Sequence, residues 1–180
     1  MTRVTLSPLA ASDREAFVAA MTASHELHHP WLFPPTNDVA FAALLARDVD
    51  GRHETHVVKL ADGAIAGYFT VGEIVRGALQ SAYLAYGGVA GLDGRGYMSE
   101  GLGLLLDHIF GAMSLHRAEA NIQPANHRSI ALVRRAGFSK EGFSPRYLNI
   151  AGEWRDHERW ALTVEDWRAR RTPKRTPKKS

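Results

Sequence analysis

A glycine-rich turn, Gly94-Arg95-Gly96-Tyr97-Met98-Ser99, has the residue types and the position to bind an anion. It follows a β-branched and aromatic run, residues 81–89, and precedes apolar residues that recur at spacings of three and four. A strand that ends in such a turn and opens a helix places free backbone N–H groups at the positive end of the helix dipole. Gly94 and Gly96 lack a Cβ, so the chain can turn tightly and approach a ligand, while Arg95 adds a cation. The turn therefore predicts a phosphate or pyrophosphate site.

Other anion-binding loops fit this turn less well. A Walker A loop needs a Lys-Ser or Lys-Thr pair after its last glycine, and none follows these glycines. A dinucleotide fingerprint needs Gly-x-Gly-x-x-Gly after the first strand of a βαβ unit, but Ser99 stands at the third glycine position and the turn lies mid-chain. Taken alone, the turn is also compatible with an ordinary helix start.

The segment from His25 to Pro35 contains the letters of a zinc-protease motif, His-Glu-x-x-His. That chemistry needs both histidines on one helical turn, and Pro30 pushes His29 out of helical geometry. We therefore expect no metal here. Two interpretations of the segment stay open: an aromatic and proline-rich connection that packs over a pocket, or a loop anchored in the core by Trp31 and Phe33.

Composition limits the class of protein. A chain of 180 residues with 45% apolar and 23% charged residues is expected to form one domain of a soluble protein. Without cysteine it can form no disulfide, no thiolate metal site and no acyl-cysteine intermediate, so any acyl transfer is expected to be direct. No secretory segment follows Met1 and no apolar run approaches the ~20 residues that span a bilayer. We expect a cytoplasmic protein with no membrane partner.

The net charge of +3 is unevenly distributed. Residues 168–180 carry seven basic groups and no acid, which leaves residues 1–167 with 15 basic and 19 acidic groups, a net of −4. The segment is low in complexity, so we expect a folded domain over residues 1–167 and a disordered basic tail over 168–180. The tail either only solubilises the chain or gives weak, salt-dependent contact with RNA or the ribosome.

Pattern and turn residues predict the elements that position the glycine-rich turn. A first helix is expected from about Ser12, with Ser12 and Glu15 as a capping box, and a second over residues 37–47 with Asn37 or Asp38 as its cap. A third helix is expected directly after the glycine-rich turn. A fourth is expected over residues 126–136, with Asn126 as its cap and Gly137 as its C-terminal stop. Strands are expected at residues 3–7, 53–60, 64–75, 81–89, 116–122, 138–142, 147–150 and 154–163.

Three separated motifs resemble the GNAT superfamily of N-acetyltransferases. On the pyrophosphate loop Gln/Arg-x-x-Gly-x-Gly/Ala, Gly96 matches the glycine, Asp93 takes the Gln/Arg place and Met98 stands where Gly or Ala is usual. Asn126-x-x-Ser129, then Gly137-Phe138 and Glu141-Gly142, resemble the second acetyl-CoA motif. Three further segments resemble the RimJ/RimL branch of this superfamily: Tyr147-Leu148, the His-His-Pro-Trp loop at residues 28–31, and the stretch from Gly94 to Glu100. The last two fit the RimJ side. That branch acetylates N-terminal α-amines of ribosomal and some other proteins.

The resemblance covers about residues 3–167 and implies a fold and a cofactor. It implies an α/β GNAT fold, with a mixed, mostly antiparallel sheet of about seven strands flanked by helices and a cleft where two central parallel strands splay. It implies acetyl-CoA as the donor, with no metal. The implied cofactor-binding residues are Gly88, Val89, Gly94, Arg95, Gly96, Tyr97, Met98, Ser99, Asn126 and Ser129.

The resemblance also implies roles in acyl transfer. Ser129 is expected to protonate or hydrogen-bond the departing thiolate, and a backbone N–H near Val89 to stabilise the oxyanion. Relatives often carry a carboxylate as general base where this chain has Arg146, so Glu73 and Tyr147 are the substitute candidates. A weak base suffices for an α-amine, whose pKa is about 7.7–8.0, and does not suffice for lysine at about 10.4.

Several alternatives stay open at this point. Arg146 is expected to contact acidic groups of the acceptor, with Trp31 and Phe33 lining its site. Asp93 is expected to cap the helix and point away, while Arg95 compensates its charge.

The acceptor is expected to be a protein N-terminus. A small amine is the alternative, as is a non-catalytic acyl-CoA-binding module whose tail docks on RNA. An open acidic cleft would favour the protein acceptor, and a closed aromatic pocket the small amine. Either a monomer or a homodimer is compatible with the sequence.

Overall fold

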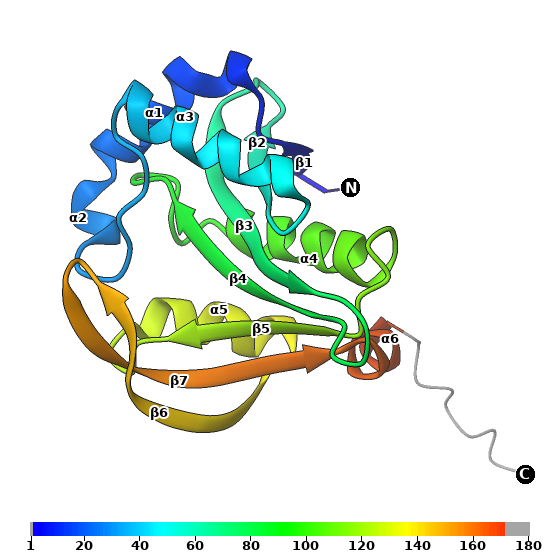
Figure 1. The fold of residues 1–180 in the computed structure, drawn as a ribbon. Helices are drawn as coiled ribbons and strands as arrows, with labels where there is room; N and C mark the ends of the chain where they lie inside the picture. Colours follow the sequence, from blue (N-terminus) through cyan, green and yellow to red (C-terminus); the bar gives the residue numbers. More distant parts are fainter. Residues whose placement is uncertain (1, 172–180) are drawn as a thin grey trace, which may run out of the picture.

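Seven strands form a single sheet in the computed structural model, which describes residues 2–171 (Figure 1). The spatial order is β1-β2-β3-β4-β5-β7-β6, and β4 and β5 are the parallel pair in an otherwise antiparallel sheet. The strands are β1 (Val4–Pro8), β2 (Glu54–Leu60), β3 (Ile65–Val75), β4 (Ser81–Gly88), β5 (Arg117–Ile122), β6 (Ser139–Ile150) and β7 (Glu153–Thr163). The predicted mixed sheet of about seven strands is confirmed.

Local signals account for most helix ends. Asn37 Oδ1 accepts from the Ala40 N–H at 2.9 Å, and Asn126 Oδ1 accepts from the Ser129 N–H at 3.1 Å. The helices are α1 (Arg14–Ala23), α2 (His25–His28), α3 (Asp38–Arg47), α4 (Tyr97–Phe110), α5 (His127–Ala136) and α6 (Val164–Arg171), with short 3₁₀ turns at Ala11–Asp13 and Asp48–Asp50. Within residues 2–171, none of these helices has the length and hydropathy needed to cross a bilayer.

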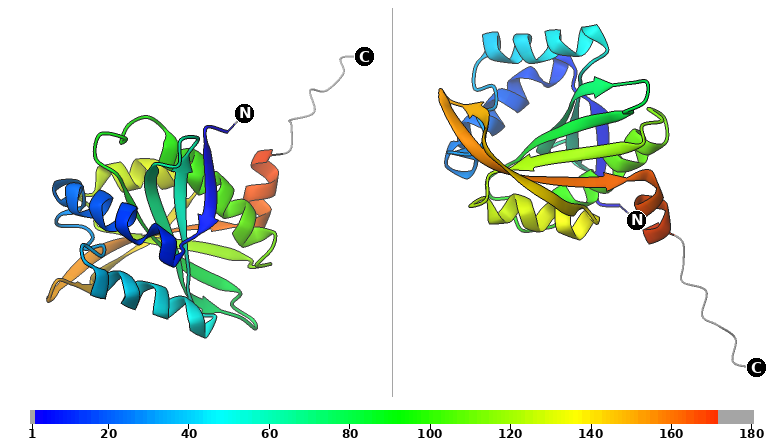
Figure 2. Two further views of the ribbon diagram at one scale, coloured as in Figure 1. Left: turned by 90° about the horizontal axis from the view of Figure 1, so that it is seen from above. Right: turned by 60° about the horizontal axis from the view of Figure 1, so that its bottom comes forward.

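Helices lie on opposite faces of the sheet (Figure 2). Two clusters of buried apolar side chains hold them there. One contains Phe17 of α1 and Phe41 of α3 packed against Val57 and Tyr68. The larger cluster joins α4 and α5 to the other face through residues such as Leu102, Leu105, Val133, Val58 and Phe69. Adjacent residues Val57 and Val58 thus face opposite clusters, as the two-residue period of a strand requires.

The two central parallel strands separate soon after they pair. β4 and β5 are in register only at Ser81–Arg117, Ala82–Ala118 and Tyr83–Glu119. Beyond these pairs β4 continues to Gly88 and β5 to Ile122 without further pairing, and the two strands diverge in Figure 1. Along this gap the backbone of β4 has no strand partner on the β5 side, which is what an extended ligand needs to pair with a strand.

Three local expectations differ from the structure. Ser12 does not cap α1, because a 3₁₀ turn comes first and the Asp13 carboxylate accepts from the Ala10 N–H at 3.0 Å. The two short strands expected at 138–142 and 147–150 form one strand, β6, which is bent by a register shift between Ser144 and Leu148. Helix α6 continues to Arg171, four residues beyond the expected domain end at Trp167.

The C-terminal residues of α6 pack on the fold. Arg170 Nη2 donates to the Arg135 carbonyl at 3.0 Å, and Arg171 pairs with Asp107 of α4. These basic residues were expected to belong to the tail, but tertiary contacts that sequence periodicity does not reveal extend the helix through them. The rest of the expected tail, residues 172–180, lies outside the described residues.

Candidate active site

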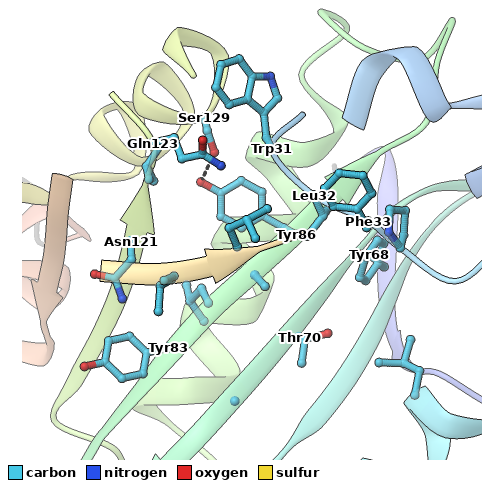
Figure 3. Close-up of a pocket in the computed structure, with 18 of the residues that line it drawn as sticks. Trp31, Leu32, Phe33, Tyr68, Thr70, Tyr83, Tyr86, Asn121, Gln123 and Ser129 are labelled. Atoms are coloured by element: carbon cyan, nitrogen blue, oxygen red, sulfur yellow. Dashed lines mark hydrogen bonds between the residues drawn. The ribbon is translucent and has the colours of Figure 1, made fainter. Parts of the chain in front are cut away.

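Two cavities adjoin at the gap between β4 and β5. One, of about 580 Å³, is lined by the glycine-rich turn, the end of β4 and one side of α5. The other, of about 770 Å³, lies over β3, β4 and the β6–β7 hairpin. Both cavities are lined by Trp31, Leu32, Tyr86, Asn126 and Ser129, so a ligand in the first can reach a ligand in the second at these residues. Figure 3 shows Trp31, Leu32, Tyr86 and Ser129 in the lining of the 770 Å³ cavity.

The glycine-rich turn opens α4 as predicted. Gly96 is the N-cap with φ 87°, a left-handed conformation that favours glycine, and Gly94 has φ 74°. The first-turn N–H groups of an α-helix have no partner inside the helix, so those of Tyr97, Met98 and Ser99 are available at the positive end of the dipole. Gly94, Gly96, Tyr97, Met98 and Ser99 all line the 580 Å³ cavity.

Arg3, which lies near the N-terminus, holds this turn in place. Its Nη2 donates to the Arg95 carbonyl at 3.0 Å, and its Nε donates to Glu100 Oε1 at 2.7 Å. The Glu100 carboxylate also accepts from the Arg3 backbone N–H at 2.8 Å. Hydrogen bonds from Arg3 to this carboxylate lower the pKa of Glu100, so the clamp stays charged at neutral pH. The backbone of the turn is therefore fixed before a ligand binds.

The cation of the cavity differs from the one predicted. Arg95 is exposed and does not line the cavity, whereas Arg128 and Arg135 of α5 do. Asp93 does not cap α4 either: its Oδ1 accepts from the Gly91 N–H at 3.2 Å and its Oδ2 pairs with Arg128 Nη1 at 3.2 Å. Asp93 thus bridges the turn and α5. The cations were missed because α5 follows the turn by some 30 residues and meets it only in the fold.

Met98 fits its unusual place because Gly67 of β3 leaves room for it. A Cβ built on Gly67 would lie 2.3 Å from Met98 Sδ, whereas one on Gly88 would only make an ordinary contact with Met98 Cγ at 3.6 Å. The thioether therefore packs onto the sheet in space that Gly67 leaves open. A long side chain at this position is compatible with a ligand at the turn.

Backbone groups at the end of β4 are only partly free. The Val89 N–H donates to the Ala66 carbonyl at 3.0 Å, so Val89 itself does not supply the free N–H that was expected near this residue to stabilise an oxyanion. In an antiparallel ladder the bonded pairs alternate, and the register pairs Gly88 with Gly67 and Tyr86 with Phe69 at the alternate, non-bonded positions. The amides of Tyr86 and Gly88 therefore point away from β3 and towards the gap.

His28 occupies one of these backbone groups. Its Nε2 lies 2.7 Å from the Gly88 carbonyl oxygen, and the imidazole is buried beside the 580 Å³ cavity. Burial lowers the pKa of His28, so the ring is neutral at pH 7 and Nε2 carries the proton that it donates. This fixes α2 to the strand at the site. The sequence signal was present in the His-Glu-Leu-His run, but it suggested metal chemistry.

Ser129 and Tyr86 form a hydrogen-bonded pair at the junction of the cavities. Ser129 Oγ lies 2.7 Å from the Tyr86 hydroxyl, the contact drawn as a dashed line in Figure 3. Burial raises the pKa of Tyr86 to about 12, with the Ser129 hydrogen bond opposing it, so the phenol stays protonated at neutral pH. Asn126 uses its carbonyl oxygen to cap α5 and keeps its NH₂ group for a ligand. Tyr86 was not among the predicted site residues.

The 770 Å³ cavity receives most of the residues predicted for the acceptor. Trp31, Phe33, Glu73 and Tyr147 line it, and Phe33 is 52% exposed, so Phe33 does not anchor the loop in the core. Arg146 is exposed and lines neither cavity; its backbone N–H donates to Asp156 Oδ1 at 2.7 Å and its φ is 48°.

Two polar side chains in this cavity, Glu73 and Tyr83, already have protein partners. Glu73 Oε2 pairs with Arg52 Nη2 at 3.1 Å, and its Oε1 lies 3.8 Å from Nε2 of the buried His53. A hydrogen bond with Tyr147 raises the pKa of Tyr83 to about 12. The lining contains both an acid, Glu73, and a base, Arg47, so the acidic cleft anticipated for a protein acceptor is not observed among the described residues.

A sequence profile described as "Acetyltransferase (GNAT) domain" matches residues 3–139, which include the glycine-rich turn and α5. This chain belongs to the GNAT acetyltransferase family. Two curated relatives of this GNAT chain are the [Ribosomal protein uS5]-alanine N-acetyltransferase of Escherichia coli, 40% identical over 103 residues, and the probable N-acetyltransferase YjcK of Bacillus subtilis, 33% identical over 117 residues. The matches cover 57% and 65% of this chain, and 53% and 65% of those relatives, so the chain spans about half to two thirds of their length.

Solved structures support the same GNAT assignment. Mycobacterium smegmatis RimJ in complex with CoA-disulfide is 34% identical, with a TM-score of 0.80 over 90% of this chain and 82% of that chain. Spermidine N-acetyltransferase from Vibrio cholerae in complex with CoA and spermine has a TM-score of 0.78 at 19% identity, over 93% and 99% of the two chains. The second likeness concerns the fold alone.

Proposed function

We propose that this GNAT chain is an acetyl-CoA-dependent N-acetyltransferase whose acceptor is the N-terminal α-amine of a protein. The observation that carries the proposal is the pair of cavities that meet at Ser129 and Tyr86, one with an anion site at a helix N-terminus and the other large enough for an acceptor chain. Support for the acceptor class comes from the similarity to RimJ and to the uS5-alanine acetyltransferase.

In the proposed complex the 580 Å³ cavity holds CoA. The first-turn amides of α4, with Arg128 and Arg135, bind the pyrophosphate, and the outward amides of Tyr86 and Gly88 pair with the pantetheine arm. The Asn126 amide adds a donor to the same arm. The thioester then lies beside Ser129, and the Val89 N–H, already bonded to the Ala66 carbonyl, is not free to face the developing oxyanion.

The acceptor amine attacks the thioester carbonyl directly, since the chain has no cysteine to carry the acetyl group. Ser129 Oγ donates to the Tyr86 hydroxyl in the free protein; turned towards the departing thiolate, the same O–H hydrogen-bonds to it, while the Tyr86 phenol, which stays protonated at pH 7, donates to Ser129 Oγ and holds it in place. The base is water-mediated, with Tyr147 and Glu73 as the flanking groups, which suits an α-amine with a pKa of about 7.7–8.0.

Two peptides of one sequence test the acceptor. One has a free N-terminal Ala or Ser, and the other has a blocked N-terminus and an internal Lys. Release of CoA thiol from acetyl-CoA with the first peptide only is the expected result. Release with neither peptide, while polyamines or amino-acid amides support turnover, would replace the protein acceptor by a small amine. If no amine gives release but acetyl-CoA raises the melting temperature, the chain is a binding module.

For the basic residues beyond Arg171 we propose a weak contact with the ribosome. Truncation of residues 172–180, which removes four basic side chains, is expected to leave acetylation of the free peptide unchanged. Co-sedimentation with ribosomes at low salt is expected to weaken only if these residues make phosphate contacts. Cytoplasmic location and the choice between monomer and homodimer stay predictions.

A further inference from the structure

A cluster outside both cavities brings together two histidines and one glutamate. Glu54 and His56 lie on β2, and His108 lies in the last turn of α4, which packs on the same face of the sheet. The Nε2 atoms of His56 and His108 lie 3.2 Å and 2.8 Å from one atom, Glu54 Oε2. None of the three residues lines the cavities that hold the proposed reaction.

These three residues have the donor set of a transition-metal site. All three ligand atoms lie within 4.8 Å of one another. A tetrahedral Zn²⁺ with bonds of about 2.0–2.1 Å spaces its ligands roughly 3.3 Å apart, so only small side-chain rotations would admit an ion. Two imidazoles and one carboxylate bind Zn²⁺ in many proteins and leave a fourth position for water.

Rigid elements on both sides already hold the donors. His56 is buried in the middle of β2, in register with Pro8 of β1 and Phe69 of β3. His108 is half-buried on α4, and its ring centroid lies 5.0 Å from that of His56. The helix C-terminus carries the negative end of the dipole, which favours a cation beside His108.

The chemistry of the donors also suits a cation. Both Nε2 atoms face the Glu54 carboxylate, which accepts their hydrogen bonds. A neutral imidazole carries its proton on either ring nitrogen, so each ring can offer a lone pair from Nε2 to an ion once its proton sits on Nδ1. One carboxylate oxygen and two imidazole nitrogens thus lie around one small space.

We propose that Glu54, His56 and His108 form a zinc-class metal site that clips α4 to β2 and takes no part in acetyl transfer. The ion replaces the hydrogen bonds between the carboxylate and the imidazoles, and no redox change accompanies it. Because α4 begins at the glycine-rich turn, an ion bound near its last turn stabilises the element that supports the cofactor loop.

Titration of the full, tag-free chain with Zn²⁺ after chelator treatment tests the site. One equivalent is expected to bind, with a rise in Tm of about 5–10 °C at ion concentrations about 100-fold above the Kd, and Mg²⁺ is expected to give no rise. Co²⁺ as the probe is expected to show the visible absorption of a tetrahedral site with nitrogen and oxygen ligands.

Two histidine substitutions distinguish Zn²⁺ binding at this site from binding at other histidines. His108→Gln, at a half-buried position that tolerates change, is expected to weaken Zn²⁺ binding at least tenfold and abolish the Co²⁺ spectrum. His116→Gln is the matched control, because His116 Nε2 also lies 3.1 Å from a carboxylate, that of Glu165, but belongs to no three-ligand group in residues 2–171. Absence of binding, or equal binding by His108→Gln and the native chain, would overturn the proposal. Acetylation by His108→Gln is expected to match the native rate in chelator.

Discussion

The hydroxyl groups of Ser129 and Tyr86 lie 2.7 Å apart where the two cavities meet. If they act as one hydrogen-bonded unit that stabilises the departing thiolate, Ser129→Ala lowers kcat about 10- to 100-fold, towards the low end of general-acid effects because a thiolate is a good leaving group. Tyr86→Phe is expected to lower kcat by a similar factor, and the double variant to be no slower than Ser129→Ala alone. Steady-state kinetics with the free-amine peptide measure all three.

The control for this cycle is binding. Acetyl-CoA is expected to raise the melting temperature of all three variants as much as that of the native chain, since neither hydroxyl is needed to hold the pyrophosphate. Effects of the two substitutions that multiply in the double variant would contradict a shared role of the two hydroxyls. The pKa of Tyr86, about 12, also predicts that no alkaline loss of kcat arises from this phenol below about pH 11.

Two arginines near the turn give a matched pair for the phosphate site. Arg128 lines the cavity, whereas Arg95 is exposed outside it and contributes its carbonyl to the Arg3 clamp. Arg128→Gln is expected to weaken acetyl-CoA binding about 3- to 10-fold, a modest loss because the side chain is largely exposed and shares its charge with Asp93. Arg95→Gln is expected to change the Kd less than twofold. Calorimetric titration measures both values of the Kd. A larger loss of affinity in Arg95→Gln than in Arg128→Gln would mean that Arg95 of the turn supplies the cation of the phosphate site.

At the scale of elements, α4 approaches the sheet closely at one glycine and faces open space at another. A Cβ on Gly101 would lie 2.7 Å from Val58 Cγ2 and 3.2 Å from Phe69, while one on Gly103 meets nothing within 4 Å. Gly101→Ala is therefore expected to destabilise the chain by about 1–3 kcal/mol through overpacking. Gly103→Ala is expected to stabilise it by about 0.5–1 kcal/mol through helix propensity.

Urea unfolding of the two alanine variants checks this pair of opposite signs. Both substitutions add one methyl group to the same helix, so a difference in sign isolates the contact with the sheet. Equal effects of the two substitutions would mean that α4 is less tightly packed on β2 and β3 than the structure has it. The cofactor turn depends on this packing, because its amides are the first turn of the same helix.

Local chemistry explains which elements the sequence predicts well. Asn37, Asn126 and Gly137 mark helix ends through a single side-chain or backbone property, and all three do so in the structure. The glycine-rich turn is likewise set by left-handed glycines and by the helix that follows. Such signals need no knowledge of residues far along the chain.

Tertiary contacts explain what the sequence did not predict. Asp93 meets Arg128, His28 meets the Gly88 carbonyl and Tyr86 meets Ser129 across 35, 60 and 43 positions. Arg171 in the last described turn of α6 pairs with Asp107 across a similar separation along the chain. A pattern of residue types contains no measure of these distances, so the cofactor side of the site was predictable as a loop but not as a set of contacts.

At the scale of the whole molecule, the sheet is two halves joined at β4 and β5 by three register pairs. Antiparallel neighbours complete each half, with β1–β4 on one side and β5, β7 and β6 on the other. The two halves are also bridged by contacts between α4 and α5, which adjoin the 580 Å³ cavity. A ligand that pairs with β4 and binds α4 and α5 at once therefore strengthens the joint between the halves.

Amide hydrogen exchange tests this joint residue by residue. Acetyl-CoA is expected to slow exchange of the Gly88 amide at least tenfold, because the register leaves that N–H unpaired and facing the gap. The neighbouring Val89 amide, already bonded to the Ala66 carbonyl, is expected to change little. ADP is the matched control ligand, since it offers phosphates to the α4 turn but has no pantetheine arm for β4. Protection of the Gly88 amide by ADP as well would contradict strand-like pairing of the pantetheine arm with β4. So would a lack of protection by either ligand while acetyl-CoA still raises the melting temperature. In both cases the pantetheine arm lies elsewhere.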